Sequence, residues 1–500
     1  MKDKAPDRRS SCDQWAIVAC VAMLLIVGAL AWRHPLGTFA TETDFYGVYA
    51  PQANNLLAGR PYTYRRGAFG YPWLVGVISL ATGDLFTAGK ILSVVSSVLL
   101  LWFAYRVLRC VTDPLVALGA IALTGIALVP HAFVAATDPV AAALVWAALW
   151  VIVRRDSAGP RAWCVAGLLA GASWLVRFQS LFVLAGMFLG ALLWAGGPWR
   201  RRAACAGAFF GGALLMMAPW LITNWRTNGS PFANELYLQM AAHLYDPDHE
   251  WPMTFKYKFG PRFTSMGQVL MADPRHALRQ TLHEIFVDDP QTLAEQILRF
   301  PGYLFVGVGL LVLGRTSDPR RRLVLWTCLL GYLMLGMSSF EPRYYIFLLP
   351  VLFAALAVPL LNERFGVGRW VGLLVFLIVA GTIASNAINE TKKVLREEPR
   401  QLLPIAALIR QHTKPGDLIL SRKPHLGYLT GCEVKFPTAN TVEEFVAFAH
   451  DNHAKYLIYS AYEAKLWPGL KSLADPTAVP ATLQMVYRDA PTDTLVYEVR

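Results

Sequence analysis

Thr41-Glu42-Thr43-Asp44-Phe45-Tyr46 begins a polar, aromatic-rich segment, residues 41–73, between two very apolar stretches. The segment continues through Gly59-Arg60-Pro61-Tyr62, Arg65-Arg66 and Tyr71-Pro72-Trp73. A carboxylate such as that of Asp44 can accept a proton from a hydroxyl group. The guanidinium groups of Arg65 and Arg66 can hold a phosphate, because they match its oxygens in geometry and charge. The segment is equally consistent with a solvated loop in which Asp44 caps a helix.

The composition is that of a membrane protein. The 500 residues are 55% hydrophobic and only 16% charged, with a mean hydropathy of +0.39, and several apolar runs reach the roughly 20 residues needed to cross a bilayer. The net charge of +12 is typical of Lys and Arg gathered in cytoplasmic loops. No basic-aromatic pattern indicates nucleic-acid binding, and the scattered cysteines indicate neither a zinc site nor a disulfide framework.

The N-terminus can be interpreted in two ways. Residues 15–32 are apolar and follow several basic residues, and Ala29-Leu30-Ala31 is similar to a signal-peptidase site. The run is long for a signal peptide and many apolar runs follow it, so an uncleaved first span is expected. In both cases, the chain after Trp32 emerges on the outer side of the membrane.

Hydropathy and charge together predict the topology. Eleven spans are predicted, at 15–33, 86–107, 112–131, 136–154, 161–177, 178–196, 203–225, 297–314, 321–339, 344–361 and 369–389. The apolar segment 69–82 is predicted to be a helix in the membrane interface, because counting it as a span would move nearly all arginine clusters outside. The N-terminus is then cytoplasmic and the C-terminus lies outside.

This topology gathers the unusual polar features on the outer face. They are Asp44, Thr137-Asp138-Pro139, Arg177-Phe178-Gln179, Asn224-Trp225-Arg226 and Glu341-Pro342-Arg343-Tyr344-Tyr345. Five loops that converge on one side predict a site at the outer membrane surface.

The long outer loop, residues 226–296, is predicted to form short interfacial helices. Its cluster of possible metal ligands comprises His243, Asp246, Asp248, His249 and Glu250. Their spacing matches no standard ligand set, so a solvated loop is expected and a metal site is not.

The polar tail, residues 391–500, is predicted to be a small soluble α/β domain that follows a membrane domain, residues 1–390, with a first outer loop at 34–85. Helices are expected at 401–413 and 441–453, strands at 417–420 and 456–459, and a hairpin at 483–487 and 494–499. The tail contains no glycine-rich phosphate loop, and we assign it no chemistry.

The order of these motifs resembles that of the GT-C glycosyltransferases, which include protein O-mannosyltransferases and the aminoarabinose transferases that modify lipid A. The resemblance covers most of the chain and rests on Thr43-Asp44-Phe45-Tyr46, residues 56–62, the helix at 69–82, Ala136-Thr137-Asp138-Pro139, Leu175–Gln179, Ala218–Asn224, Arg343-Tyr344 before Leu348-Leu349-Pro350, and residues 426–431 of the tail. The mannosyltransferases often show Asp-Glu at the first motif. Here Phe45 follows Asp44, so that subfamily matches less well.

The resemblance implies transfer of a sugar from a polyprenyl-phosphate donor to an outer acceptor (a lipid, glycan or protein) in a bacterial inner membrane. It implies an inverting displacement with Asp44 as the base and Asp138 orienting a substrate. The donor phosphate would be bound by Arg65, Arg66, Arg177 and Arg343, with support from Tyr46, Glu341 and Tyr344. No cofactor is expected, although some relatives use a divalent cation.

Each of these residues also has a structural interpretation. Asp138 before Pro139 is a natural helix cap, and Arg177 can pair with a lipid headgroup or with Glu341. Arg343 can anchor the chain in the interface beside Tyr344, and Glu341 can simply pair with Arg343. Arg65 and Arg66 can contact anionic headgroups.

Two other classes of protein remain as alternatives. A transporter or lipid flippase usually carries ionisable residues near the membrane midplane and often has inverted repeats. The predicted spans are nearly free of such residues and no repeat is visible, which favours surface chemistry. An inactive scaffold of the same fold is the second alternative, and only the presence of Asp44 and Asp138 weighs against it.

Overall fold

The structure is a computed structural model. It describes residues 8–155, 158–246, 259–336, 341–362, 368–437, 439, 441–460, 463, 467–475 and 477–500. The chain forms two compact units: Met1–Arg33 with Pro61–Lys393, and His34–Arg60 with Val394–Arg500. The sequence places a division near residue 390. The grouping of residues 34–60 with the tail comes from contacts described below.

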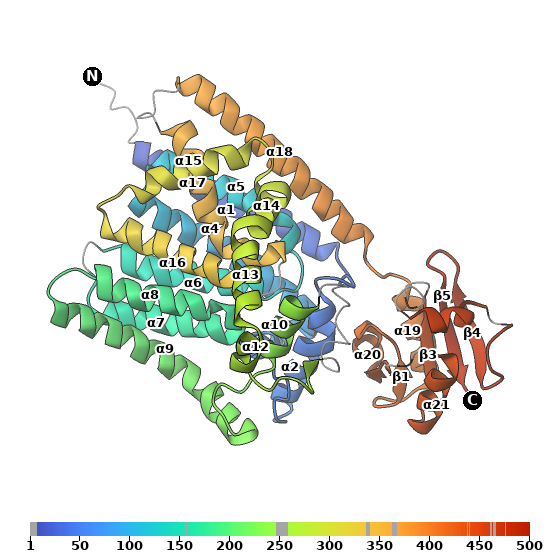
Figure 1. Cartoon of the computed structure of the whole chain (residues 1–500). Helices are drawn as coiled ribbons and strands as arrows, with labels where there is room; N and C mark the ends of the chain where they lie inside the picture. Colours follow the sequence, from blue (N-terminus) through green and yellow to red (C-terminus); the bar gives the residue numbers. More distant parts are fainter. Residues whose placement is uncertain are drawn as a thin grey trace. The chain divides into compact units, whose positions relative to one another are not determined.

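The first unit is built from helices, labelled in Figure 1. The longer ones are α1 (Arg8–Trp32), α4 (Leu85–Val111), α5 (Pro114–Ala132), α6 (Asp138–Val153), α7 (Pro160–Val176), α8 (Leu181–Trp194), α9 (Trp199–Asn228), α15 (Gly302–Gly314), α16 (Pro319–Leu335), α17 (Leu349–Leu361) and α18 (Arg369–Arg396). A helix therefore occupies the main part of each segment predicted to span the membrane.

Six helices among the described residues are long and apolar enough to cross a membrane, or seven if a helix pair bent by 116° counts as one span. The six are Ser11–Trp32, Leu85–Val111, Pro114–Ala132, Trp199–Asn228, Pro342–Leu361 and Arg369–Arg396. Other predicted spans are helices of 13 to 17 residues, about 20–26 Å long against a hydrocarbon core of about 30 Å. The helical membrane fold is confirmed, and the count of eleven spans is not.

Helices α7 and α9 lie side by side (Figure 1). Glycines let their backbones approach closely: a Cβ added to Gly167 would lie 2.0 Å from the carbonyl oxygen of Phe209, and one added to Gly212 would lie 2.3 Å from that of Cys164. Small residues at helix contacts are typical of membrane helix pairs. Because α7 ends just before Arg177, this close packing fixes where that side chain emerges.

Short elements lie between the spans. In the first unit they are α3 (Gly70–Thr82), η2 (Phe178–Ser180), α10 (Leu236–Tyr245), α12 (Met266–Ala272), α13 (Pro274–His283), η3 (Glu284–Asp288), α14 (Asp289–Thr292), η4 (Leu293–Leu298) and η5 (Pro342–Leu348). Helix α3 occupies the segment predicted to be an interfacial helix and ends at Gly83, whose φ is 73°. Such a left-handed conformation suits glycine.

The described residues of segment 226–296, which was predicted to be a long outer loop, form short helices, and α10 and its neighbours have a small hydrophobic core of their own. The core contains Leu238, Met240, Ala241, Leu244, Phe259, Val269 and Ala277. Of the possible metal ligands in this loop, His243 lies 3.4 Å from Glu284, and Asp248, His249 and Glu250 fall outside the described residues. In the part of the chain that the structure describes, no three His, Cys, Asp or Glu side chains cluster as a metal site would require.

The second unit contains a five-stranded sheet in the order β2-β1-β3-β5-β4. Its strands are β1 (Leu418–Leu420), β2 (Glu433–Lys435), β3 (Tyr456–Tyr459), β4 (Leu483–Asp489) and β5 (Thr494–Val499), and its other elements are η1 (Phe45–Tyr49), α2 (Ala50–Leu57), α19 (Leu402–His412), α20 (His425–Thr430), α21 (Val442–Asp451) and η7 (Pro468–Ala474). Strand β1 pairs in parallel with β2 and β3, and β5 pairs antiparallel with β3 and β4. The predicted strands, helices and final hairpin are confirmed. Strand β2 was not predicted, because it has only three residues and no buried side chain.

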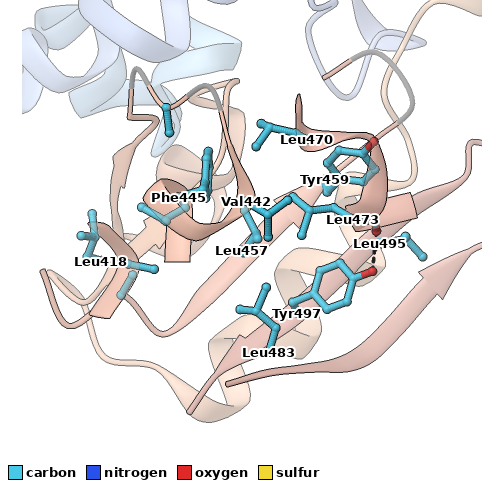
Figure 2. Close-up of a cluster of buried hydrophobic side chains, with 14 residues drawn as sticks. Leu418, Val442, Phe445, Leu457, Tyr459, Leu470, Leu473, Leu483, Leu495 and Tyr497 are labelled. Carbon is cyan, nitrogen blue, oxygen red and sulfur yellow. Dashed lines mark hydrogen bonds between the residues drawn. The ribbon is translucent and has the colours of Figure 1, made fainter. Parts of the chain in front are cut away.

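The core of this unit lies between the sheet and its helices (Figure 2). Leu457 on β3, Leu495 on β5 and Phe445 on α21 are at most 1% exposed. The hydroxyl of Tyr497 donates a 2.5 Å hydrogen bond to the carbonyl oxygen of Leu473, which satisfies a polar group inside an apolar core.

Candidate functional site

The first candidate site joins the start of α6 to the end of α7. Asp138 is the first residue of α6 and is 5% exposed, and Arg177 follows α7 in an extended conformation. Nη1 of Arg177 lies 2.7 Å from Oδ1 of Asp138 and donates a 2.9 Å hydrogen bond to Oγ1 of Thr137. The structure therefore brings together two residues that the sequence singled out separately.

The second carboxylate oxygen of Asp138 has different surroundings. Oδ2 is buried, and no hydrogen-bond partner for it lies among the described residues. Thr137 occupies the N-cap position of α6 without a side-chain capping hydrogen bond, and Asp138 is already the first residue of the helix, so Asp138 is not the cap that its position before Pro139 suggested. Leaving a buried acceptor unsatisfied costs about 1–3 kcal/mol. A hydroxyl group of a substrate, or a water, would satisfy it.

Segment η5 brings a second arginine to the same place. Nε of Arg343 lies 2.5 Å from Oε2 of Glu341, the pairing that the sequence offered as a structural interpretation. The guanidinium carbon of Arg177 lies 4.4 Å from the centre of the Tyr344 ring and that of Arg343 lies 5.7 Å from it. The ring faces of Tyr and Trp attract such cations, so Tyr344 holds the two arginines on the same pocket.

A small pocket of about 30 Å³ is lined by Asp138, Arg177, Arg343 and Tyr344, and also by Gln179 and Ser180. The volume is enough for one or two water-sized groups. Two guanidinium groups and a carboxylate with one unsatisfied oxygen can bind one end of a ligand that carries both an anionic oxygen and a hydroxyl. We call this the Asp138 pocket.

A larger cavity of about 360 Å³ adjoins the Asp138 pocket, and Ile346 lines both. Its polar lining residues are His131, Gln296, Arg299, Asn386, Glu390 and Lys393, and the rest of the lining is apolar. His131 is close enough to Asp138 and Arg343 to interact with both charges. No local signal in the sequence indicates this cavity, because its lining comes from segments more than 250 residues apart.

Arg299 is held at the cavity in an unusual conformation. Its φ is 55°, a left-handed value that costs a non-glycine residue free energy and is often found at functional sites. One guanidinium nitrogen, Nη2, donates a hydrogen bond to Asn386. In the described residues, the buried Nε has no partner. The only signal in the sequence was an arginine before Phe300-Pro301, which is too weak to single out.

The remaining arginines predicted to bind phosphate do not reach these two cavities. Arg65 is exposed and Arg66 is half-buried, and neither is among the described residues that line the Asp138 pocket or the larger cavity. The main-chain oxygen of Arg65 accepts a hydrogen bond from the N–H of Glu235. In this structure Arg65 therefore helps to fix the start of the segment 226–296.

Asp44 belongs to the second unit and is exposed at the start of η1. Its carboxylate forms no capping hydrogen bond to η1, so the capping interpretation does not hold. Tyr46 is 2% exposed, and its hydroxyl accepts a 2.8 Å hydrogen bond from the N–H of Gly37. Tyr46 therefore fixes the loop that carries Asp44 and lies away from solvent.

Lys423 in the tail contacts the Asp44 loop directly. Its Nζ donates hydrogen bonds to the carbonyl oxygen of Phe39 at 2.5 Å and to Oγ1 of Thr43 at 3.1 Å. Burial and the nearby Arg422 lower the pKa of Lys423 to about 8, although the negative charge of Asp44 opposes this shift. Asp44 thus has a cationic neighbour that the sequence analysis did not find.

A buried pair of ionic contacts also ties the loop to the tail. Nε2 of His34 lies 2.7 Å from Glu42, and its Nδ1 lies 2.7 Å from Glu398. All three side chains are fully buried. Burial alone would lower the pKa of His34, but hydrogen bonds and charges from both glutamates raise it above its usual value. Sequence reasoning missed this contact because Glu398 lies 364 positions from His34.

His425 completes this contact as a neutral side chain. Burial lowers its pKa to about 3, and its Nε2 donates hydrogen bonds to the carbonyl oxygens of Gly37 and Thr38 at 3.1 and 3.2 Å. The ring of Tyr46 lies 4.1 Å from that of His425. The sequence identified residues 426–431 as part of a motif. His425, the residue just before this motif, supports the Asp44 loop.

The fold of the chain is similar to that of several solved membrane proteins. The archaeal oligosaccharyltransferase AglB from Archaeoglobus fulgidus, solved with an inhibitory peptide and a dolichol-phosphate, matches with a TM-score of 0.55 at 12% identity over 90% of this chain and 70% of that chain. ArnT from Cupriavidus metallidurans in the apo state matches with a TM-score of 0.56 at 14% identity over 96% of this chain and 97% of that chain. The fold is that of the GT-C glycosyltransferases.

Other comparisons agree with the GT-C fold. ArnT bound to undecaprenyl phosphate matches with a TM-score of 0.51 at 15% identity over 96% of this chain and 97% of that chain. The family model of dolichyl-phosphate-mannose-protein mannosyltransferases matches residues 66–223, a stretch that contains Asp138 and Arg177 but neither Asp44 nor Arg343. No curated protein matches the chain by sequence.

Proposed function

We propose that this protein transfers a sugar from a polyprenyl-phosphate donor to an acceptor on the outer side of a bacterial inner membrane. The observation that carries the proposal is the Asp138 pocket: two arginines beside a buried carboxylate oxygen that has no hydrogen-bond partner among the described residues, on a GT-C fold. The related structures solved with dolichol-phosphate and undecaprenyl phosphate support a lipid phosphate as the donor's carrier.

The proposed reaction is a single inverting displacement. A hydroxyl oxygen of the acceptor attacks C1 of the donor sugar, and the bond from C1 to the phosphate oxygen breaks with its electron pair going to the lipid phosphate. The acceptor's proton goes to Asp44, which is exposed and therefore accessible to a substrate. Arg177 and Arg343 stabilise the negative charge that develops on the phosphate, an effect that is often the largest in catalysis.

Asp138 has a positioning role in this proposal. Its Oδ1 holds Arg177 at 2.7 Å, and its unsatisfied Oδ2 accepts a hydrogen bond from a sugar hydroxyl. Because the side chain of Asp138 is buried and its Oδ1 is already paired with Arg177, it is a poorer candidate than the exposed Asp44 for taking up the acceptor's proton. The buried aspartate thus orients, and the exposed aspartate is the base.

The larger cavity suits the rest of the donor. Its lining combines apolar side chains with Arg299 and Lys393 against one carboxylate, Glu390. Such a lining fits an amphiphile with an anionic head and an apolar chain. At about 360 Å³, the cavity is within the usual range of small-molecule sites.

The proposed reaction needs neither ATP nor a metal ion, because the activated bond arrives with the lipid. The expected result is that EDTA leaves the transfer rate of the purified protein unchanged. A rate that falls with EDTA and returns with Mg²⁺ or Mn²⁺ would overturn this part of the proposal.

Mass spectrometry of the cell envelope tests the function as a whole. A strain that lacks the gene is compared with the same strain carrying the wild-type protein, Asp44→Asn or Arg177→Lys, each at matched levels in the membrane. The expected result is a lipid, glycan or protein that lacks one sugar in the deletion strain, regains it with the wild type and stays unmodified with either variant. An envelope that shows no missing sugar, or full restoration by Asp44→Asn, would contradict the proposal.

A further inference from the structure

The second unit contains a pocket of its own beside Lys423, with a volume of about 110 Å³. The pocket is lined by Phe39 from the Asp44 loop and by residues of the tail. Lys423 also contacts Thr43 and interacts electrostatically with Asp44. The pocket therefore lies beside the proposed base. Its volume exceeds that of a single water site several-fold, so it has room for a polar ring.

The lining of this pocket is rich in groups that bind hydroxyls. Its uncharged polar members are Gln401, Ser421, Ser460, Thr492 and Thr494. Several are already held in place: Oγ of Ser421 donates a 3.1 Å hydrogen bond to the carbonyl oxygen of Lys423, and the hydroxyls of Thr492 and Thr494 lie 2.8 Å apart. A hydroxyl that donates internally keeps lone pairs that accept hydrogen bonds from a ligand.

The charges around the pocket are balanced. Nε of Arg422 lies 2.9 Å from Oε1 of Glu463, and the other oxygen of that carboxylate accepts hydrogen bonds from the main chain and side chain of Ser460. The positive charge of Lys423 faces the negative charge of Asp44. The lining thus holds two cations and one carboxylate, and Asp44, which lies outside the lining, supplies a second negative charge near Lys423. Counted together, these four charges leave little net charge to attract a phosphate or carboxylate ligand.

We propose that this pocket binds an uncharged sugar ring of the acceptor and presents one of its hydroxyls to Asp44. Fixed hydroxyl and amide groups suit the hydroxyls of such a ring, and the aromatic side chain of Phe39 suits its apolar face. The inference rests on the proposed function and narrows it: the acceptor is a glycan or glycolipid, and the tail is the part of the chain that selects it.

Direct binding tests this assignment without the donor. The full-length protein is placed in lipid nanodiscs, because maltoside detergents would compete for a sugar site. Saturation-transfer-difference NMR is recorded with the methyl glycosides of glucose, galactose, mannose and N-acetylglucosamine, and separately with inorganic phosphate by ³¹P line broadening. The expected result is binding of at least one glycoside and none of phosphate.

Variants locate the binding. Gln401→Leu and Thr492→Val each remove one polar group from the pocket and should weaken glycoside binding at least fivefold. Thr482→Val is the matched control, because Thr482 is exposed in the same unit and outside the pocket, and it should leave binding unchanged. Glycoside binding that survives both pocket variants, or that is absent up to 50 mM for all four glycosides, would overturn the inference, as would phosphate binding that Gln401→Leu abolishes.

The outcomes also separate this inference from the proposed function. If the envelope loses a sugar in the deletion strain but no glycoside binds the pocket, only the acceptor assignment fails. If a glycoside binds as described but the envelope lacks no sugar, the pocket stands as a sugar-binding site and the transferase proposal fails.

Discussion

Asp138 and Asp44 are the two aspartates that the sequence singled out as candidate catalytic residues, and the structure gives them opposite surroundings. Asp138 is buried at the start of α6 and held 2.7 Å from Arg177, which follows the helix α7 that packs closely against α9 through glycines. Asp44 is exposed on a loop that the tail holds through buried ionic and aromatic contacts. A buried, paired carboxylate supplies a fixed charge, whereas an exposed one can exchange a proton. The same side chain therefore suits two roles, and burial decides which.

Replacing Asp44 should have the largest effect on activity and almost none on stability. General-base catalysis is typically worth 10²–10⁴-fold, so Asp44→Asn should lower the transfer rate by at least about 100-fold. Because the side chain is exposed, the thermal midpoint should shift by less than the error of the measurement. A radiolabelled donor assay beside a thermal-shift assay checks both. A stable protein that retains more than a tenth of its rate would show that Asp44 is not the base.

Breaking the Asp138–Arg177 pair should affect both stability and activity. Removing one partner of a buried pair typically costs about 3 kcal/mol or more, so Asp138→Asn and Arg177→Gln should each lower the thermal midpoint and the transfer rate. A double-mutant cycle is the decisive measurement. The two losses should be far from additive, because each substitution removes the same contact. Additive losses would mean that the two side chains act separately. Asp138 would then not act as a charge fixed by Arg177, and its contrast with the exposed Asp44 would be lost.

The sequence predicted the local structure of both regions but only part of their chemistry. Apolar runs located the helices of the first unit, and period-two alternation located β4 and β5. The positive-inside rule predicts that Asp138, Arg177 and Arg343 lie on the same side of the membrane, and the structure brings these three to one pocket. A shared side limits the search to a few loops, which is why this part of the site could be predicted.

The surroundings of Asp44 could not be predicted, because they depend on contacts over long sequence distances. Lys423 lies 380 positions from Thr43, and Glu398 lies 364 positions from His34. A lone histidine before a proline and a lysine after an arginine carry no local signal for such a pairing. The span count also could not be settled by hydropathy, because several apolar runs form helices of only 13 to 17 residues.

Raising the pH should loosen the Asp44 loop and leave the Asp138 pocket intact. His34 has a folded-state pKa above its usual value, so its contribution to stability is complete below about pH 6.5 and is lost as the pH rises through the folded-state pKa. The pair in the Asp138 pocket contains no histidine. Hydrogen exchange of residues 34–60, corrected for the intrinsic rate, should therefore increase between pH 6.5 and 9 while residues 138–153 stay protected. His34→Gln should show the faster exchange at every pH, and equal pH responses in the two regions would contradict this explanation.

The smallest expected effect distinguishes the consequence of losing the charge on Lys423 from that of losing the charge on His34. The distinction is needed because both side chains lose a positive charge as the pH rises. Lys423 has a pKa of about 8, so at pH 9 only about a tenth of the molecules keep its charge next to Asp44. Arginine stays charged throughout this range, and Lys423→Arg should hold the transfer rate several-fold higher than the wild type at pH 9 while matching it near pH 7. His34 is unchanged in this variant, so any loss due to His34 remains. If the two pH profiles coincide, the alkaline loss comes from the His34 contacts, and Lys423 supports the Asp44 loop through its hydrogen bonds to Phe39 and Thr43 without contributing its charge.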